Sequence, residues 1–223
     1  MRIVPPGGGE VIGDSSERRV EILCDRDEMH VTWTRFAAGR EGADLHVHHL
    51  HTDVFFVLAG ELTVRLGLGG EERTLPTGGL ALVPPDVVHG FRNGSGAQMR
   101  YLNVHAPGSG FADYMRGLRD GIRFVYDQHD PPEEGGRPIA EASLGVPPGQ
   151  AGPVAIDLVA AADDDLAVPA ARDHLLGAYV LDGELTVTTA DRSRAAPAGT
   201  WIEVPAGEPV ALSGAASYLR LRA

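Results

Sequence analysis

Short apolar runs separated by turn residues dominate the chain. Segments rich in Val, Leu, Phe and Thr are broken by Gly or Pro about every 8 to 12 residues, a spacing typical of antiparallel β-sandwiches and β-barrels. The 29 Gly and 16 Pro are scattered between these segments and do not gather in one tract. The pattern therefore predicts many short strands joined by tight turns, with little disorder.

An internal repeat divides this pattern into two halves. Residues 57–64 (VLAGELTV) return as residues 180–187 (VLDGELTV), at an offset of 123 residues. Residues 78–84 (GGLALVP) are echoed by residues 199–205 (GTWIEVP), at an offset of 121 residues. Duplication explains two segments that repeat in the same order, so we predict two β-barrels in tandem.

One short helix is predicted between the two barrels. Apolar residues there follow a helical period and form one face: Phe111, Tyr114, Met115 and Leu118. Gly121 follows as a helix terminator. We expect this helix to pack on the first barrel.

The stretch after the helix favours a surface connection. Residues 127–148 contain DPPEEGGRP and VPPG, whose Pro and Gly content is typical of loops. We therefore predict a first barrel with an N-terminal arm over residues 1–107, a helix and connection over 108–150, and a second barrel over 151–223.

Charge and composition restrict the partners. The formal net charge of -12 gives a surface that repels phosphate backbones and anionic lipids, so neither nucleic acid nor a membrane is expected as a partner. Cys24 is the single cysteine and cannot form an intrachain disulfide. The chain starts without the apolar run of a secretion signal and has no apolar stretch of roughly 20 residues. We expect a cytoplasmic protein that binds a small molecule, with a homodimer as one option for assembly.

The histidines are clustered. Five of the nine lie at positions 46, 48, 49, 51 and 89. In an extended segment His46 and His48 point to the same face, and a turn after them brings Asp53 inward. His89 follows residues 83–86 (VPPD), whose prolines favour an extended turn. Three imidazoles and one carboxylate suit one divalent Fe, Mn, Ni, Co, Cu or Zn ion, whereas calcium and magnesium prefer oxygen ligands.

The same residues resemble the two sequence motifs of the cupin superfamily. The first motif has the form HxH, four residues, an acid, six residues and Gly, and residues 46–60 read HVHHLHTDVFFVLAG. The second has the form Gly, five residues, PxG, two residues, His, three residues and Asn, and residues 78–93 read GGLALVPPDVVHGFRN. Asp53 stands where the family usually has Glu, and Asp86 replaces the Gly of PxG. The resemblance implies an all-β fold of two tandem double-stranded β-helix (cupin/jelly-roll) barrels with a short connecting helix.

The second copy lacks the ligand set. The 123-residue offset aligns Pro169, Ala171 and Leu176 with His46, His48 and Asp53, and the 121-residue offset aligns Val210 with His89. None of these side chains binds a metal. The resemblance is therefore to a bicupin with one metal centre, similar to quercetinase-like members.

Other polar residues have simpler interpretations. His51 has a counterpart in His174, which favours a structural role, and we expect His49 to face outward and His105 to be structural. Three arginines on predicted strands are alternatives for holding a substrate carboxylate: Arg35, Arg65 and Arg100.

Three functions follow from the resemblance and the ligand set. The first is a metal-dependent dioxygenase acting on a small enol or phenol, in which Asp53 either ligates the ion or takes the substrate proton. The second is a non-redox isomerase, cyclase or lyase that uses the ion as a Lewis acid. The third is a module that binds or senses a small ligand without turnover, since a fold alone does not select a function.

Overall fold

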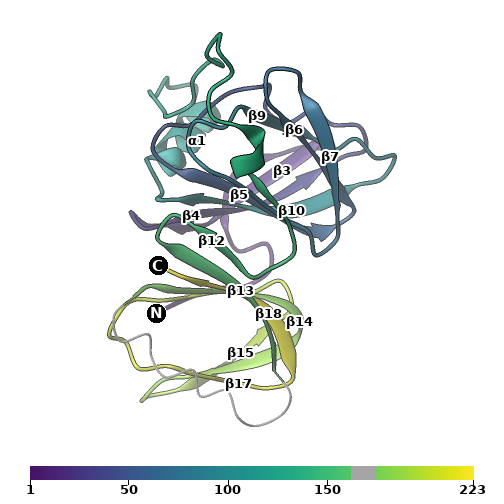
Figure 1. The fold of residues 1–223 in the computed structure, drawn as a ribbon. Coiled ribbons are helices and arrows are strands. Elements are labelled where there is room, and N and C mark those ends of the chain that lie inside the picture. The colour runs from purple at the N-terminus through teal and green to yellow at the C-terminus, as the bar shows by residue number, and fades with distance from the viewer. Residues whose placement is uncertain (162–173) are drawn as a thin grey trace. The chain divides into compact units, whose positions relative to one another are not determined.

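The chain is almost entirely β-structure. A computed structural model describes residues 1–161 and 174–223, and their strands pair antiparallel throughout. It divides into an N-terminal unit, Glu10–Pro153, and a C-terminal unit, Met1–Gly9 with Val154–Ala223 (Figure 1). The all-β prediction is confirmed. In the described part of the chain, no helix is long and apolar enough to cross a membrane.

The N-terminal unit is built from two antiparallel sheets. Its elements are β2 (Glu10–Asp14), β3 (Arg18–Asp25), β4 (His30–Phe36), β5 (Thr52–Ala59), β6 (Glu61–Leu66), β7 (Glu71–Pro76), β8 (Leu80–Val83), β9 (His89–Arg92), β10 (Met99–Ala106), α1 (Phe111–Asp120), η1 (Ile139–Glu141), β11 (Ser143–Gly145) and β12 (Gly149–Ala151). The larger sheet has the order β11-β8-β5-β10-β4-β3-β2, and the smaller has the order β7-β6-β9. The spacing of the apolar runs predicted antiparallel sheets of this kind, and the jelly-roll arrangement is the one that the resemblance implied.

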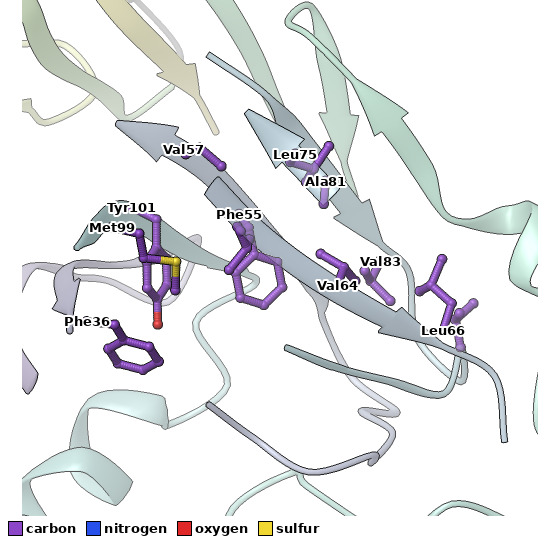
Figure 2. Close-up of a cluster of buried hydrophobic side chains, with 12 residues drawn as sticks. Phe36, Phe55, Val57, Val64, Leu66, Leu75, Ala81, Val83, Met99 and Tyr101 are labelled. Carbon is purple, nitrogen blue, oxygen red and sulfur yellow. The ribbon is translucent and has the colours of Figure 1, made fainter. Parts of the chain in front are cut away.

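The core of the N-terminal unit lies between the inner faces of the two sheets. Phe55 and Val57 from β5 share one apolar cluster with Leu62 and Val64 from β6, and all four are fully buried. Figure 2 shows Phe55, Val57 and Val64 in this cluster. Side chains alternate along a strand, so Asp53 points to the same face as Phe55 and Val57. The carboxylate is therefore placed inside the unit.

Helix α1 covers one side of the larger sheet. It spans the predicted residues and ends at Gly121, which adopts the left-handed conformation with φ of 70°. Ala112 and Met115 pack against Val20 and Ile22 of β3, as expected. Leu118 does not share this burial and remains 54% exposed.

The C-terminal unit repeats the strand pairing of the N-terminal unit. Its strands are β1 (Arg2–Val4), β13 (Val154–Ala161), β14 (Leu176–Thr188), β15 (Ser193–Pro197), β16 (Trp201–Val204), β17 (Ala211–Ser213) and β18 (Ala216–Arg222). The first half of β14 pairs with β16 and β18, as β5 pairs with β8 and β10. Its second half pairs with β15 and β17, as β6 pairs with β7 and β9. The duplication seen in the sequence is therefore a duplication of structure.

The glycine of the repeated segment adopts the same backbone conformation in both copies. Gly60 and Gly183 adopt positive φ angles of 77° and 75° where the chain turns from one sheet to the other. A Cβ at either position would collide with a backbone carbonyl, of Gln98 or of Ala215. Glycine fits both because it has no Cβ.

The unit boundaries differ from the predicted ranges. Arg2–Val4, expected as an arm of the first barrel, pairs with Trp201–Glu203 of β16 in the C-terminal unit. The expected connection 108–150 instead belongs to the N-terminal unit, where β11 adds an edge strand beside β8. Both differences arise from pairing between segments far apart in sequence, which local periodicity does not reveal.

The residues aligned with the ligands in the second copy are partly described. Leu176 and Val210 are buried in the apolar core of the C-terminal unit. Pro169 and Ala171 lie outside the described residues.

Candidate metal centre

The first two histidines lie on an extended segment between β4 and β5. The segment is not a regular strand and is held by isolated bridges from His46 to His89 and from Val47 to His129. The backbone nitrogen of His46 donates to the carbonyl of His89 over 2.8 Å, and the reverse bond measures 2.9 Å. This bridge places His46 beside His89, the first residue of β9.

The structure brings all four predicted ligands together. His46, His48, Asp53 and His89 are buried, and one ligand atom of each lies within 4.8 Å of the others. The Nε2 atoms of His46 and His48 are 3.0 Å apart. Oδ2 of Asp53 lies 3.3 Å from Nε2 of His89 and 3.9 Å from Nε2 of His48. We call these residues the four-residue group.

A backbone carbonyl orients each of the three imidazoles. Their Nδ1 atoms lie within hydrogen-bonding distance of carbonyl oxygens, in the pairs His46 with Asp44 (2.7 Å), His89 with Val87 (2.9 Å) and His48 with Asp127. A carbonyl only accepts, so each Nδ1 carries the proton and each Nε2 offers a lone pair. This is the tautomer that a metal ion requires of a ligand bound through Nε2.

Two neighbours fix the carboxylate of Asp53. The side-chain nitrogen of Asn103 donates to Oδ1 of Asp53, and Nε2 of His105 lies 3.3 Å from the same oxygen. Oδ1 therefore faces donors from β10, whereas Oδ2 faces the histidine nitrogens. The carboxylate presents one oxygen to the four-residue group.

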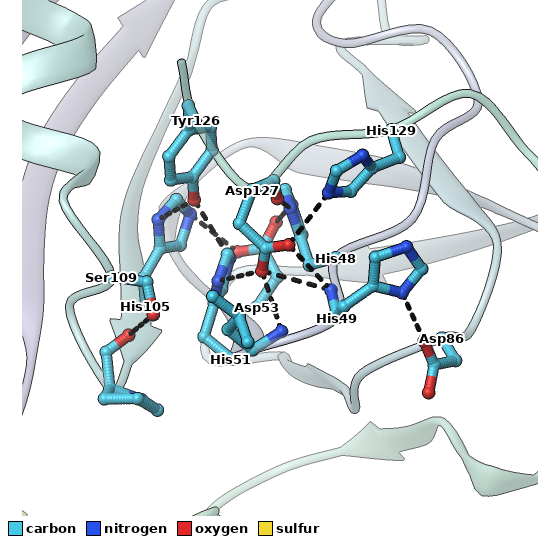
Figure 3. Close-up of polar contacts among 12 residues, drawn as sticks. His48, His49, His51, Asp53, Asp86, His105, Ser109, Tyr126, Asp127 and His129 are labelled. Atoms are coloured by element: carbon cyan, nitrogen blue, oxygen red, sulfur yellow. Dashed lines mark hydrogen bonds and ion pairs between the residues drawn. The ribbon is translucent and has the colours of Figure 1, made fainter. Parts of the chain in front are cut away.

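A second buried network lies next to the four-residue group (Figure 3). The hydroxyl of Tyr126 bridges Nε2 of His51 at 3.0 Å and Nδ1 of His105 at 2.9 Å. The carboxylate of Asp127 accepts bonds from the backbone nitrogens of His49 and Leu50. The segment after α1 is thereby tied to the loop that carries the candidate ligands.

Burial sets the protonation of these groups. It is the main cause that lowers the pKa of His46 to about 4 and that of His48 to about 2. For Asp53 burial acts in the raising direction, but the adjacent imidazoles of His105 and His89 outweigh it and hold the pKa well below its usual value. The neutral imidazoles of His46 and His48 beside the ionised carboxylate of Asp53 suit a divalent cation.

Three members of the four-residue group, His46, His48 and Asp53, line a cavity of about 250 Å³. Its lining includes the aromatic side chains of Phe91, Phe111 and Tyr114. It also includes the polar side chains of Thr32, Thr34 and Asn103 from adjacent strands of the larger sheet. Pockets that bind small molecules combine an apolar lining with a few polar groups, so the cavity is suited to a small substrate.

The departure from the second motif has a structural counterpart. Asp86 adopts a positive φ of 66°, the conformation for which glycine is the usual residue. Its carboxylate lies 2.5 Å from Nδ1 of His49. His49 thus points away from the four-residue group, as predicted.

Sequence reasoning missed the residues that support the group. Asn103 and His105 lie two residues apart on β10, and His105 stands in register with Asp53 of β5. Tyr126 and Asp127 fall in the stretch interpreted as a surface connection. His51 keeps its predicted structural role through Tyr126, although it also forms a second cluster of possible ligands with His48 and Asp127.

Comparison with known proteins agrees with the motifs. The family model described as Cupin domain matches residues 32–105, the part of the chain that contains the four-residue group. No curated protein sequence is a significant match.

Solved structures share the fold over the whole chain. Protein YlbA from Escherichia coli has 16% identity and a TM-score of 0.71, with 99% of this chain and 89% of that chain covered. The bacterial pirin YhhW of Escherichia coli, in complex with nickel(II), has 11% identity and a TM-score of 0.65, with coverage of 99% and 97%. An oxalate decarboxylase variant from Bacillus subtilis has 12% identity and a TM-score of 0.59, with coverage of 100% and 77%. Residues 32–105 thus match the Cupin domain model, and these solved structures share the fold of the chain.

Proposed function

We propose that the N-terminal unit is a metal-dependent enzyme that acts on a small molecule in the adjacent cavity. It would hold one divalent transition-metal ion on His46, His48, Asp53 and His89. The observation that carries this proposal is the convergence of four buried ligand atoms, on residues of which His46, His48 and Asp53 line a cavity. Buried polar atoms that cannot satisfy one another by hydrogen bonds lower the stability of a fold. One cation bound by all four ligand atoms would remove this loss.

The ligand geometry fits a transition metal. Ligands at about 2.0 to 2.2 Å from an ion lie roughly 3 to 4 Å from one another. The observed separations of 3.0, 3.3 and 3.9 Å fall in this range. Three nitrogen ligands and one oxygen favour Fe, Mn, Ni, Co, Cu or Zn over calcium and magnesium.

The contacts of Asp53 support a role as a ligand. Oδ1 already faces donors on Asn103 and His105, so little of its lone-pair capacity remains for a substrate proton. Oδ2 faces the nitrogens of His48 and His89. The substitution Asp53→Asn tests this: loss of metal supports a ligand, whereas retained metal with lost activity supports a base.

The reaction that we propose first is oxidation of a small enol or phenol with dioxygen. A redox-active ion, when bound, would supply the electron transfer that such chemistry needs. The aromatic rings of Phe111 and Tyr114, which contact each other at the cavity, would hold a planar substrate and limit the entry of water. The carbonyl-bound imidazoles keep their Nε2 atoms fixed, so the site does not reorganise during the reaction.

Non-redox chemistry is the second candidate. The polar wall of the cavity favours it, because Thr32, Thr34 and Asn103 can position a substrate carbonyl or hydroxyl. In this case the ion would act as a Lewis acid in an isomerase, cyclase or lyase. A binding module without turnover remains the outcome if neither activity is found.

Elemental analysis is the first test. We would purify the protein without added metal, together with His48→Ala and the control His49→Ala, whose ring bonds Asp86 away from the group. We expect about one equivalent of metal in the wild type and in His49→Ala, and little in His48→Ala. Equal metal in all three proteins would contradict the site. Fe, Mn, Ni, Co or Cu would lead to oxygen-uptake assays with enols and phenols, and zinc alone to isomerase and lyase assays.

A further inference from the structure

Two arginines border the cavity without a carboxylate partner. Arg18 of β3 and Arg40 line it, and within residues 1–161 and 174–223 neither forms an ion pair. Most other arginines of the N-terminal unit do pair with Asp or Glu: Arg19, Arg35, Arg65, Arg73, Arg92, Arg116, Arg119 and Arg137. Acidic residues outnumber arginines by 31 to 19, so most arginines can find a carboxylate partner within the protein. Arginines at a cavity that have none are suited to binding a negatively charged ligand.

The hydroxyl groups of Tyr101 and Thr34 line the same cavity as the two arginines. Tyr101 of β10 stands in register with Thr34 of β4, and both line the cavity. Burial raises the pKa of Tyr101, a hydrogen bond with Thr34 opposes the rise, and the charges of Asp53 and Arg18 both reach its hydroxyl. Tyr101 is therefore a neutral hydroxyl between a negative group and a positive one, able to bind a polar substrate atom.

The arginines proposed from the sequence have other partners. Arg35 bonds the backbone of Ser15, and Arg65 bonds the carbonyl of Ala43. Arg100 is exposed on β10, and none of the three lines the cavity. Arg18 and Arg40 line the cavity, so they are the arginines placed to bind an anion there.

We propose that the substrate carries a carboxylate that Arg18 binds, with Arg40 adding a second positive charge to the lining of the cavity. This inference rests on the proposed function, because the reacting end of the molecule would lie at the four-residue group. A guanidinium binds a carboxylate through two parallel hydrogen bonds, which gives both affinity and orientation. A cavity of about 250 Å³ admits an organic acid of modest size.

The test is calorimetric titration of the metal-loaded protein with malonate, succinate, glutarate and adipate, each against its monoamide. Every monoamide keeps one carboxylate for the metal, so the difference reports the second carboxylate. We expect at least one diacid to bind about tenfold more tightly than its monoamide. Longer diacids should show the larger preference, because the molecule must reach from the four-residue group to Arg18.

The variants are Arg18→Gln, Arg18→Lys and the control Arg100→Gln, which removes the same charge outside the cavity. The ratio of the affinity for the diacid to that for its monoamide should approach one in Arg18→Gln, be reduced in Arg18→Lys and stay unchanged in Arg100→Gln. Equal losses in Arg18→Gln and Arg100→Gln would overturn the proposal, since they would indicate a general charge effect. Arg18-dependent binding of inorganic phosphate tenfold tighter than any diacid would overturn the carboxylate assignment.

Metal content measured in every sample separates the two proposals. Bound metal with a diacid preference that ignores Arg18 would refute the carboxylate site and leave the metal-dependent enzyme standing. An Arg18-dependent preference in a protein that takes up no metal would refute the enzyme proposal. Melting temperatures of the variants within a few degrees of the wild type exclude misfolding as the cause.

Discussion

The Nε2 atoms of His46 and His48 face each other across 3.0 Å, while the Nδ1 atoms of both rings face backbone carbonyls. With the protons on Nδ1, two lone pairs point at one another in a buried space. A cation between them removes this repulsion. The geometry therefore links metal binding to the stability of the N-terminal unit.

Metal should accordingly stabilise the fold. At a free metal concentration about 100 times the dissociation constant, the expected gain is about 2.7 kcal/mol, seen as a higher melting temperature than in chelator. His46→Ala should lose this gain, and His49→Ala should retain it. The same metal-dependent rise in His46→Ala would contradict the assignment.

Asn103 should support metal affinity without touching the ion. Its side-chain nitrogen donates to Oδ1 of Asp53 and, over 3.1 Å, to the carbonyl of Val54. Asn103→Ala frees the carboxylate to rotate, and loss of such a partner typically costs 10- to 100-fold in metal affinity. Competition with a chromogenic chelator measures the loss. Thr32→Ala, in register with Asn103 on β4, is the control and should bind metal normally.

The sequence was sufficient to predict that the four candidate ligands lie together, but not which residues support them. His46, His48 and Asp53 follow from a two-residue period and one turn, and the second motif adds His89. The contact between Asp53 and His105 depends on how β5 pairs with β10, and the chain between them contains no sign of that register.

The connection after the helix illustrates a second limit of sequence reasoning. Its Pro and Gly content indicated a surface loop, and parts of it are exposed. Tyr126 and Asp127 within it are nevertheless buried beside the four-residue group. Composition describes the average of a segment, whereas a single anchored residue depends on tertiary contacts.

Tyr126 should contribute to stability through its hydroxyl. Tyr126→Phe leaves ring nitrogens of His51 and His105 without their partner, and an unsatisfied buried polar group costs about 1 to 3 kcal/mol. Urea unfolding should show a loss of that size. Tyr114→Phe is the matched control, because the ring of Tyr114 stacks on Tyr126 at 5.0 Å and no hydrogen bond of its hydroxyl is found in the described residues. Equal losses in both variants would refute the assigned role.

The positive φ of Asp86 should strain the backbone and lower the stability of the protein, and glycine at this position should relieve the strain. Its φ of 66° disfavours residues with a Cβ by about 1 kcal/mol. Asp86→Ala keeps this strain and loses the contact with His49, whereas Asp86→Gly loses the contact and the strain. We expect the glycine variant to be more stable than the alanine variant by about 1 kcal/mol in urea unfolding. An alanine variant at least as stable as the glycine variant would show that the strain is absent.

His30 should make the protein sensitive to acid. It is buried, both ring nitrogens lack a hydrogen-bond partner within the described residues, and its ring meets Phe111 edge-on at 5.1 Å. Burial is the main cause that lowers the pKa of His30 well below its ordinary value of 6.5. Below about pH 6.5 His30 takes up a proton in the unfolded chain but not in the folded protein. The free energy of unfolding that is present above this pH is therefore lost as the pH falls.

The variant His30→Leu isolates this contribution. One such histidine reduces the free energy of unfolding by about 1.4 kcal/mol for each pH unit below 6.5, and His46, His48 and His51 add to the slope because their pKa values are also lowered. Urea unfolding between pH 8 and 5 in chelator should therefore give His30→Leu a shallower slope than the wild type, with stability at pH 8 no lower, since two unsatisfied nitrogens are removed. The exposed His174, replaced by His174→Leu, is the control, because solvent hydrates its ring in the folded and unfolded states alike. An unchanged slope in His30→Leu would mean that its ring gains a proton in the folded protein as readily as in the unfolded chain.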